Sequence, residues 1–364
     1  MLFPRIFLRS FRVLLFPVSV LYGIGVYARN WLFDRGILRT AMFGMPLISV
    51  GNLAVGGTGK SPFIQYLVKL IGPNEGLAVL SRGYKRRSNG YRLAKPDSTV
   101  SEIGDEGMLL YKRFPNISVA VGEKRLLAIP QLLQDRPQTH CILLDDAHQH
   151  RSIRPGLQIL LTDYNNLFTR DFFLPTGDLR DQRKSYQRAD VLVVTKCPSD
   201  LEPAKADAIR QELNPLPNQQ VFFTSMDVEL PCHWQDPTRV RSVEHQEILL
   251  VTGIANPAPL KMWMEREASS YHFMPFSDHH HFNINDVREI RSQYRNLHNP
   301  DAWILTTSKD AVRLRSFAQE MQDLPIYVTD YQHRFLFGQE SNFQQLIQQF
   351  LSTAKSKSNG AEKQ

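Results

Sequence analysis

Cysteine is scarce in this chain, which has three among its 364 residues. Cys141, Cys197 and Cys232 form no C-x-x-C pair and no familiar zinc-ligand spacing, so neither a disulfide framework nor a structural zinc site is expected. We expect reduced, mostly buried thiols of the kind found in cytosolic proteins.

Long hydrophobic runs are missing as well. The apolar stretch VLLFPVSVLYGIGVYA, residues 13–28, has sixteen residues and contains Pro17. A membrane-spanning helix needs roughly twenty apolar residues, so this segment is too short to span. No A-x-A-like cleavage site follows it, and we therefore do not expect a removed signal peptide.

Acidic residues are nearly absent from residues 1–40, where Asp34 is the single acid. The same segment carries six arginines, namely Arg5, Arg9, Arg12, Arg29, Arg35 and Arg39. Apolar and aromatic residues flanked by arginine suit a helix that lies in the headgroup region of an anionic membrane. The alternative is a core helix packed on a domain. Nucleic acid is not an expected partner, because the arginines enclose apolar residues, and no obligate protein partner is evident.

Glycine is concentrated in GNLAVGGTGKSP, residues 51–62. The apolar residues 46–50 before it predict a buried strand, and Phe63, Ile64, Leu67, Val68 and Ile71 after it recur at helical spacing. Strand, glycine-rich loop, Lys-Ser and helix form the context of a phosphate-binding loop, whereas a flexible linker would lack the strand. The expected nucleotide-binding residues are Ala54, Val55, Gly56, Gly57, Thr58, Gly59, Lys60 and Ser61. Ala54 stands where the strict pattern has glycine and is read as a tolerated variant.

Alternating strands and helices predict an α/β fold with parallel sheets, here a two-domain P-loop NTPase-like fold. Expected strands lie at 46–50, 77–81, 117–121, 141–145, 157–161, 190–195, 247–252, 270–276, 302–306 and 325–328. Expected helices lie at 105–114, 123–134, 202–213, 257–266, 285–296 and 309–320. Pro-rich and polar residues near 215–245 suggest a boundary. The expected parts are a membrane-associated segment 1–40, a nucleotide-binding domain 41–225, a smaller α/β domain 226–351 and a disordered tail 352–364.

Acidic pairs are the first candidates for chemistry. Asp145 and Asp146 end an apolar strand, where acids in a phosphate-loop fold hold Mg²⁺ directly or through water; turn formation is the alternative. Asp105 and Glu106 open a helix, so Asp105 is either a helix cap or the general base that a kinase needs.

Histidines form two further groups. His148 and His150 lack a third ligand at zinc-site spacing, so polar substrate contacts are favoured. In FSDHHHF, Asp278 precedes His279, His280 and His281, and one of these histidines is expected to reach across a cleft and orient a carboxylate.

Two other nucleotide-binding classes fit less well. Guanine selectivity normally needs [NT]-K-x-D, but Pro198 stands where the Asp belongs in VTKCPSD. A membrane-partitioning ATPase needs a signature lysine at the position of Val55.

Ten motifs occur in one order along the chain: GNLAVGGTGKSP, SRGYKR, GDEG, VGEKRLLA, LLDDAHQHR, LPTGDLRD, VTK, VTGIANP, FSDHHHF and TTSKDAVRL. Together they resemble the tetraacyldisaccharide 4′-kinases of lipid A synthesis over about residues 10–330. That resemblance implies ATP- and Mg²⁺-dependent phosphorylation of the 4′-hydroxyl of an acylated glucosamine disaccharide 1-phosphate, forming lipid IVA. It also implies an N-terminal membrane-associated helix and a location at the cytoplasmic face of the bacterial inner membrane.

The resemblance assigns residue roles by position. Asp105 corresponds to the catalytic base, His279 to the partner that orients it, and Lys60 to the catalytic lysine of the loop. Ser61, Glu106, Asp145 and Asp146 correspond to groups around the metal. The positions that correspond to substrate-binding residues are Arg82, Tyr84, Arg125, Gln149, His150, Arg180 and Asp181. Asp181 replaces the more usual Glu and is one methylene shorter.

Overall fold

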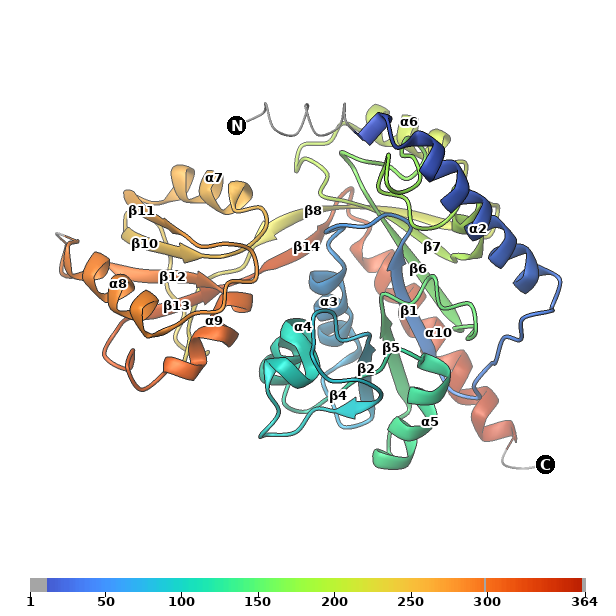
Figure 1. The fold of residues 1–364 in the computed structure, drawn as a ribbon, viewed down its shortest axis with the longest axis horizontal. Coiled ribbons are helices and arrows are strands. Elements are labelled where there is room, and N and C mark those ends of the chain that lie inside the picture. Colours follow the sequence, from blue (N-terminus) through green and yellow to red (C-terminus); the bar gives the residue numbers. More distant parts are fainter. Residues whose placement is uncertain (1–11, 298, 362–364) are drawn as a thin grey trace.

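Two mostly parallel sheets form the framework of the protein (Figure 1). The computed structural model describes residues 12–297 and 299–361, with side chains described through Ala354. The larger sheet has the strand order β14-β8-β7-β6-β1-β5-β2-β4-β3, and the smaller has the order β11-β10-β12-β13-β9. Residues 1–11 of the predicted membrane-associated segment 1–40 lie outside the described residues.

The strands of the larger sheet are β1 Leu47–Asn52, β2 Leu77–Ser81, β3 Arg92–Leu93, β4 Ser118–Val121, β5 Cys141–Asp145, β6 Leu157–Asp163, β7 Val191–Thr195, β8 Gln220–Val228 and β14 Tyr331–Phe335. Strands β1, β2, β4, β5 and β7 are buried throughout, which explains their apolar runs. Helices α3 Lys60–Ile71, α4 Val100–Arg113 and α10 Glu340–Ala361 pack on one face, with Phe63 and Phe343 in that core. Helices α5 Arg125–Asp135 and α6 Pro203–Leu213 contribute Ile129 and Ile209 to the other face.

The smaller sheet contains β9 Cys232–His233, β10 Glu247–Thr252, β11 Ser270–Pro275, β12 Trp303–Thr307 and β13 Ile326–Thr329. Helix α7 Ala258–Glu267 covers one face through Leu260 and Met264. Helices α8 Ile284–Arg295 and α9 Ser308–Leu314 cover the other, with Ile290 and Leu314 buried. The 3-10 turns Arg183–Arg188 and Arg315–Phe317 complete the described elements together with α2 Phe16–Asp34.

The α/β class, the parallel sheets and all ten predicted strands are confirmed, and the ends of each strand lie within two residues of the predicted ones. Helix α4 begins at Val100, earlier than predicted, with a capping box at Thr99. Gly104, at φ +78°, kinks it just before Asp105, so the predicted helix corresponds to the part after the kink. The predicted helix 309–320 is shorter, since α9 ends at Leu314 and a 3-10 turn follows.

The C-terminal end of the chain differs from the predicted tail 352–364 and from the predicted domain 226–351. Residues 352–361 continue helix α10 and are not an irregular tail, while 362–364 lie outside the described residues. The smaller unit also ends before 351, because β14 pairs with β8 and α10 packs on the larger sheet through Phe343 and Ile347. The division into two domains remains a prediction with this changed boundary.

Two strands connect the two sheets. Strands β8 and β14 pair antiparallel from Val228–Tyr331 to Thr224–Phe335, and Figure 1 shows both of them between the two sheets: β8 leads to the smaller sheet and β14 leads back. The candidate site lies where α3 and α4 of the larger sheet meet α9 of the smaller one.

Candidate active site

The phosphate-binding loop follows β1 and leads into α3. Gly56 and Gly59 have φ values of +112° and +84°, a region that side chains other than glycine rarely adopt. A Cβ added at Gly56 would meet no atom within 4 Å, so the backbone there borders open space. Helix α3 has no side-chain cap, which leaves its N-terminal amides for a phosphate group. These features fit ATP phosphates.

A strand far away in sequence supports this loop. His333 of β14 donates from Nε2 to the Gly59 carbonyl oxygen at 2.9 Å, and its Nδ1 accepts from the Thr224 hydroxyl at 2.9 Å. Thr195 donates to the Thr58 carbonyl oxygen at 2.9 Å. Burial lowers the pKa of His333 to about 4, so its imidazole is neutral at pH 7.

Asp146 is an ion-paired acid. Arg180 donates to its Oδ2 at 2.9 Å and also bonds Oδ1, while the Lys60 ammonium lies 3.6 Å from Oδ1. Burial alone would raise the pKa of Asp146, but Arg180 and Lys60 outweigh it and hold that pKa well below its usual value. Asn52 accepts from Lys60 at 3.1 Å and from Arg180 at 2.5 Å, so it holds both cations in place.

Asp145 has the opposite environment. Its side chain is buried, its Oδ1 has no hydrogen-bond partner, and burial together with Glu106 and Asp146 raises its pKa to about 7. Ser61 donates to Glu106 Oε1 at 2.6 Å. An unpaired carboxylate oxygen, a second carboxylate and a hydroxyl are oxygen ligands that suit Mg²⁺.

No complete cage of three or more His, Cys, Asp or Glu side chains exists among residues 12–297 and 299–361. Mg²⁺ at nucleotide sites is usually bound through one or two carboxylates plus phosphate oxygens and water, so the residues present fit this ion.

The Asp105 carboxylate is fixed from the smaller sheet. His279 Nδ1 lies 2.8 Å from Asp105 Oδ2, and Arg313 of α9 donates to Oδ2 at 2.5 Å and to Oδ1 at 3.2 Å. Burial favours the protonated acid, but the hydrogen bonds from Arg313 and His279 lower the pKa of Asp105 below its usual value. His279 has φ +60°, an unusual conformation for a residue other than glycine, and such outliers gather at functional sites.

The remaining predicted substrate residues fall into two groups. Tyr84 is exposed, with its ring centroid 6.4 Å from that of His279, and Arg82 is exposed in the same loop. Gln149 donates to the Asn52 carbonyl oxygen at 2.6 Å. Burial, together with the positive charges of Arg125 and Arg82, lowers the pKa of His150 to about 4. Tyr84 thus lies beside His279, and Gln149 lies beside Asn52 at the end of β1.

Arg125 and Asp181 are buried instead. Arg125 donates to backbone carbonyls of Gly122 and Asp145, the latter at 2.8 Å. Asp181 accepts from Asn30 of α2 and from Arg188, at 2.8 and 2.9 Å. In this structure Asp181 therefore holds α2 against the larger sheet, and its contact with substrate stays a prediction.

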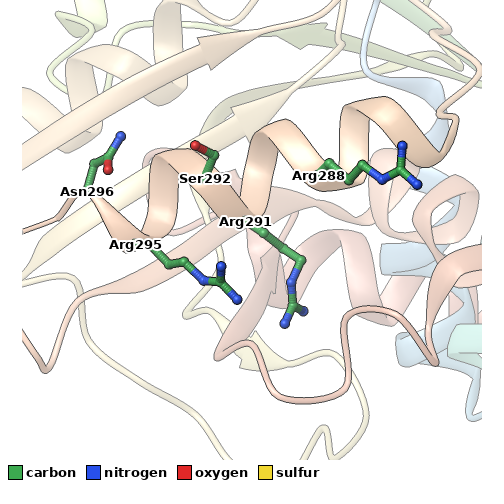
Figure 2. Close-up of a pocket in the computed structure, with 5 residues that line it drawn as sticks. All are labelled: Arg288, Arg291, Ser292, Arg295 and Asn296. Carbon is green, nitrogen blue, oxygen red and sulfur yellow. The ribbon is translucent and has the colours of Figure 1, made fainter.

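Sequence reasoning missed Asn52, His333, Lys309 and Arg313. Lys309 lies 3.2 Å from Glu106 Oε1, one helical turn before Arg313. The motif TTSKDAVRL contains both α9 cations, and its position after an apolar strand is the signal that could have drawn attention to them. The pocket in Figure 2 lies elsewhere, along α8, and includes none of the predicted site residues.

Comparison with known proteins identifies the family of this chain. The family model described as tetraacyldisaccharide-1-P 4′-kinase matches residues 11–352. Tetraacyldisaccharide 4′-kinase of Bacteroides thetaiotaomicron is 41% identical, covering 92% of this chain and 91% of its own. The Flavobacterium johnsoniae protein of that name is 40% identical, covering 93% and 97%.

A solved structure is similar in fold. The crystal structure of "apo" form LpxK from Aquifex aeolicus in complex with ATP has a TM-score of 0.73 and 27% identity, covering 94% of this chain and 99% of that one. The matched range 11–352 spans nearly the whole chain, and the loop, the acidic pairs and the histidine group described above lie within it. The chain belongs to the tetraacyldisaccharide-1-P 4′-kinase family.

Proposed function

We propose that this chain transfers the γ-phosphoryl group of ATP to the 4′-hydroxyl of an acylated glucosamine disaccharide 1-phosphate, forming lipid IVA, with Asp105 as general base. The observation that carries the proposal is the position of Asp105. It is held by His279 at 2.8 Å and adjoins Glu106, whose carboxylate accepts from the loop residue Ser61. The base is thus one residue away from the phosphate-binding machinery.

The chain's own groups divide the chemistry among them. Lys60, Arg180 and the α3 N-terminus bind the phosphate oxygens and stabilise the negative charge that spreads during transfer. Asp105 accepts the proton of the attacking hydroxyl, and His279 fixes the orientation of that carboxylate. Ser61, Glu106 and Asp145 would hold Mg²⁺, which neutralises charge on the β- and γ-phosphates when bound.

Helix α2 supports a role at a membrane surface. Its inward side is small or polar: Ser19 donates to Thr176 at 2.8 Å, Asn30 donates to Asp181, and Gly23 lies against Phe173. Its outward side is apolar, with exposed side chains that include Val18, Leu21, Ile24 and Tyr27. No helix within the described ranges 12–297 and 299–361 is long and apolar enough to span a membrane.

An apolar helix face turned away from the protein core needs another apolar partner. Arg29 and Arg35 lie near the C-terminal end of this helix, where cations can meet anionic headgroups. We infer that α2 lies in the surface of an anionic membrane, as at the cytoplasmic face of the inner membrane, and brings the site to its lipid substrate.

The catalytic proposal is tested by ³²P transfer from ATP to the disaccharide 1-phosphate in detergent micelles. We expect Asp105→Ala to lower kcat by ~100-fold or more, since general bases contribute ~10²–10⁴-fold. Asp97→Ala removes an exposed acid outside the site and should be as active as the wild type. Full activity of Asp105→Ala would refute the assigned base, and free phosphate without labelled lipid would refute the lipid kinase.

The membrane proposal is tested by flotation with phosphatidylglycerol vesicles. Leu21→Glu places a charge on the exposed α2 face and should abolish flotation, whereas Met262→Glu, at an equally exposed α7 position, should not. Equal flotation of the Leu21 variant and the wild type would contradict this role of α2.

A further inference from the structure

Arg313 is the least exposed cation that contacts the proposed base. The exposed fraction of its side chain is 6%, and its guanidinium donates to both oxygens of Asp105. Arg313 lies on α9 of the smaller sheet and Asp105 on α4 of the larger one. A contact that joins two sheets at a reacting group can fix the geometry of that group as well as hold the sheets together.

Arg313 is itself held by a second acid. Asp310, which is fully buried, lies 3.3 Å from the Arg313 guanidinium. Asp310 accepts from the hydroxyls of Thr252 and Thr307 at 2.8 and 2.7 Å and from the Gly253 amide at 3.1 Å. The ends of β10 and β12 therefore fix Asp310, and Asp310 fixes Arg313.

The distribution of hydrogen bonds over Asp105 is unequal. Oδ2 receives the two short contacts, from His279 and Arg313, while Oδ1 receives the longer contact of 3.2 Å from Arg313 Nε. A carboxylate oxygen has room for about two hydrogen bonds. Among the described contacts, Oδ1 is therefore the oxygen with capacity for a substrate hydroxyl.

A bidentate guanidinium also determines the plane of the carboxylate that it binds, which a single contact from His279 does not. We propose that Arg313 is a positioning residue of the phosphoryl transfer: it fixes the Asp105 carboxylate so that Oδ1 points to the attacking hydroxyl of the sugar. This inference rests on the proposed role of Asp105 as the base. The alternative is that Arg313 only connects the two sheets.

The two roles differ in a double-mutant cycle. If Arg313 acts through Asp105, Arg313→Ala should lower kcat by ~10–100-fold in the wild type and have no further effect in Asp105→Ala, because the carboxylate that it positions is gone. The KM for ATP should stay within ~3-fold, since the phosphate loop is intact. Arg313→Lys, which keeps the charge but not the fork, should recover only part of kcat.

An arginine outside the site provides the control. Arg291→Ala removes an arginine of the α8 row in Figure 2 that pairs with Asp323 at 2.6 Å, and should leave activity unchanged. The inference is overturned if Arg313→Ala lowers the residual activity of Asp105→Ala as strongly as it lowers that of the wild type. It is also overturned if Arg313→Lys is fully active, a result that does not depend on how well the alanine variant folds. Undiminished activity of Asp105→Ala would instead overturn the proposed base.

Discussion

Asp145 allows a prediction in which stability and function change in opposite directions. Without a cation, its carboxylate is buried beside Glu106 and Asp146, and Oδ1 has no partner. The rise of its pKa from 3.8 to about 7 corresponds to about 4 kcal/mol against the charged form. Asn has the same shape but buries an amide with few partners, at a cost of about 2 kcal/mol. Asp145→Asn should therefore raise the free energy of unfolding by about 2 kcal/mol at pH 8.

The assay is urea unfolding without nucleotide and with EDTA, at pH 8 and pH 5. Because the pKa of Asp145 is raised in the folded state, the folded protein keeps the Asp145 proton between pH 3.8 and about 7, whereas the unfolded chain loses it. The destabilisation by the buried charge is therefore complete only above about pH 7. The advantage of the Asn variant should shrink at pH 5. With Mg²⁺ and ATP, the wild type should gain stability and the variant should gain less, and its kinase activity should fall.

The neighbouring acid is the matched control. Asp146 is paired with Arg180 and Lys60, so Asp146→Asn should lower the free energy of unfolding by about 1–2 kcal/mol at pH 8. An Asp145→Asn variant that is no more stable than the wild type at pH 8, or that has the same advantage at both pH values, would refute the reasoning.

Three other substitutions test the support of the phosphate loop and the anchoring of α2. Gly59→Ala places a Cβ 3.0 Å from the His333 ring at φ +84° and should weaken ATP binding by ~10-fold or more in equilibrium titration; unchanged affinity would contradict the strained-loop argument. His333 has a folded pKa of about 4 against 6.5 unfolded, so its neutral form contributes about 3 kcal/mol that is lost as pH falls from 6.5 to 4. His333→Gln should remove that part of the pH dependence of urea unfolding, whereas exposed His272→Gln should not. Asp181→Ala leaves half-buried Arg188 without its acid and Asn30 of α2 without its acceptor, so it should cost about 2 kcal/mol and speed proteolysis within α2; an unchanged digestion pattern would contradict the anchoring role.

Much of the framework was predictable because its signals are local. Buried parallel strands such as Cys141–Asp145 are continuous apolar runs, and each helix between them has its own periodic pattern. The structure departs from the prediction where local pattern is weak. Strand β14 has three consecutive polar residues, Gln332 to Arg334, and its pairing partner β8 lies about a hundred residues earlier.

The candidate site likewise combines residues that the sequence reveals with residues that it does not. The phosphate loop is a contiguous segment, so its residue types and spacing identify it from sequence alone. Contacts between distant residues leave no such spacing: 208 positions separate Arg313 from Asp105, and 274 separate His333 from Gly59. The different states of Asp145 and Asp146 also depend on tertiary neighbours, because adjacent acids look alike in sequence.

The late return of the chain to the larger sheet has a consequence for synthesis on the ribosome. Strand β14 supplies His333, which supports Gly59, but it leaves the ribosome only after both the larger sheet's other strands and the smaller sheet have been made. A nascent chain that ends before β14 would carry the whole phosphate loop without its support. Nucleotide binding should therefore mature late in translation, and a chain released early should be unable to trap ATP.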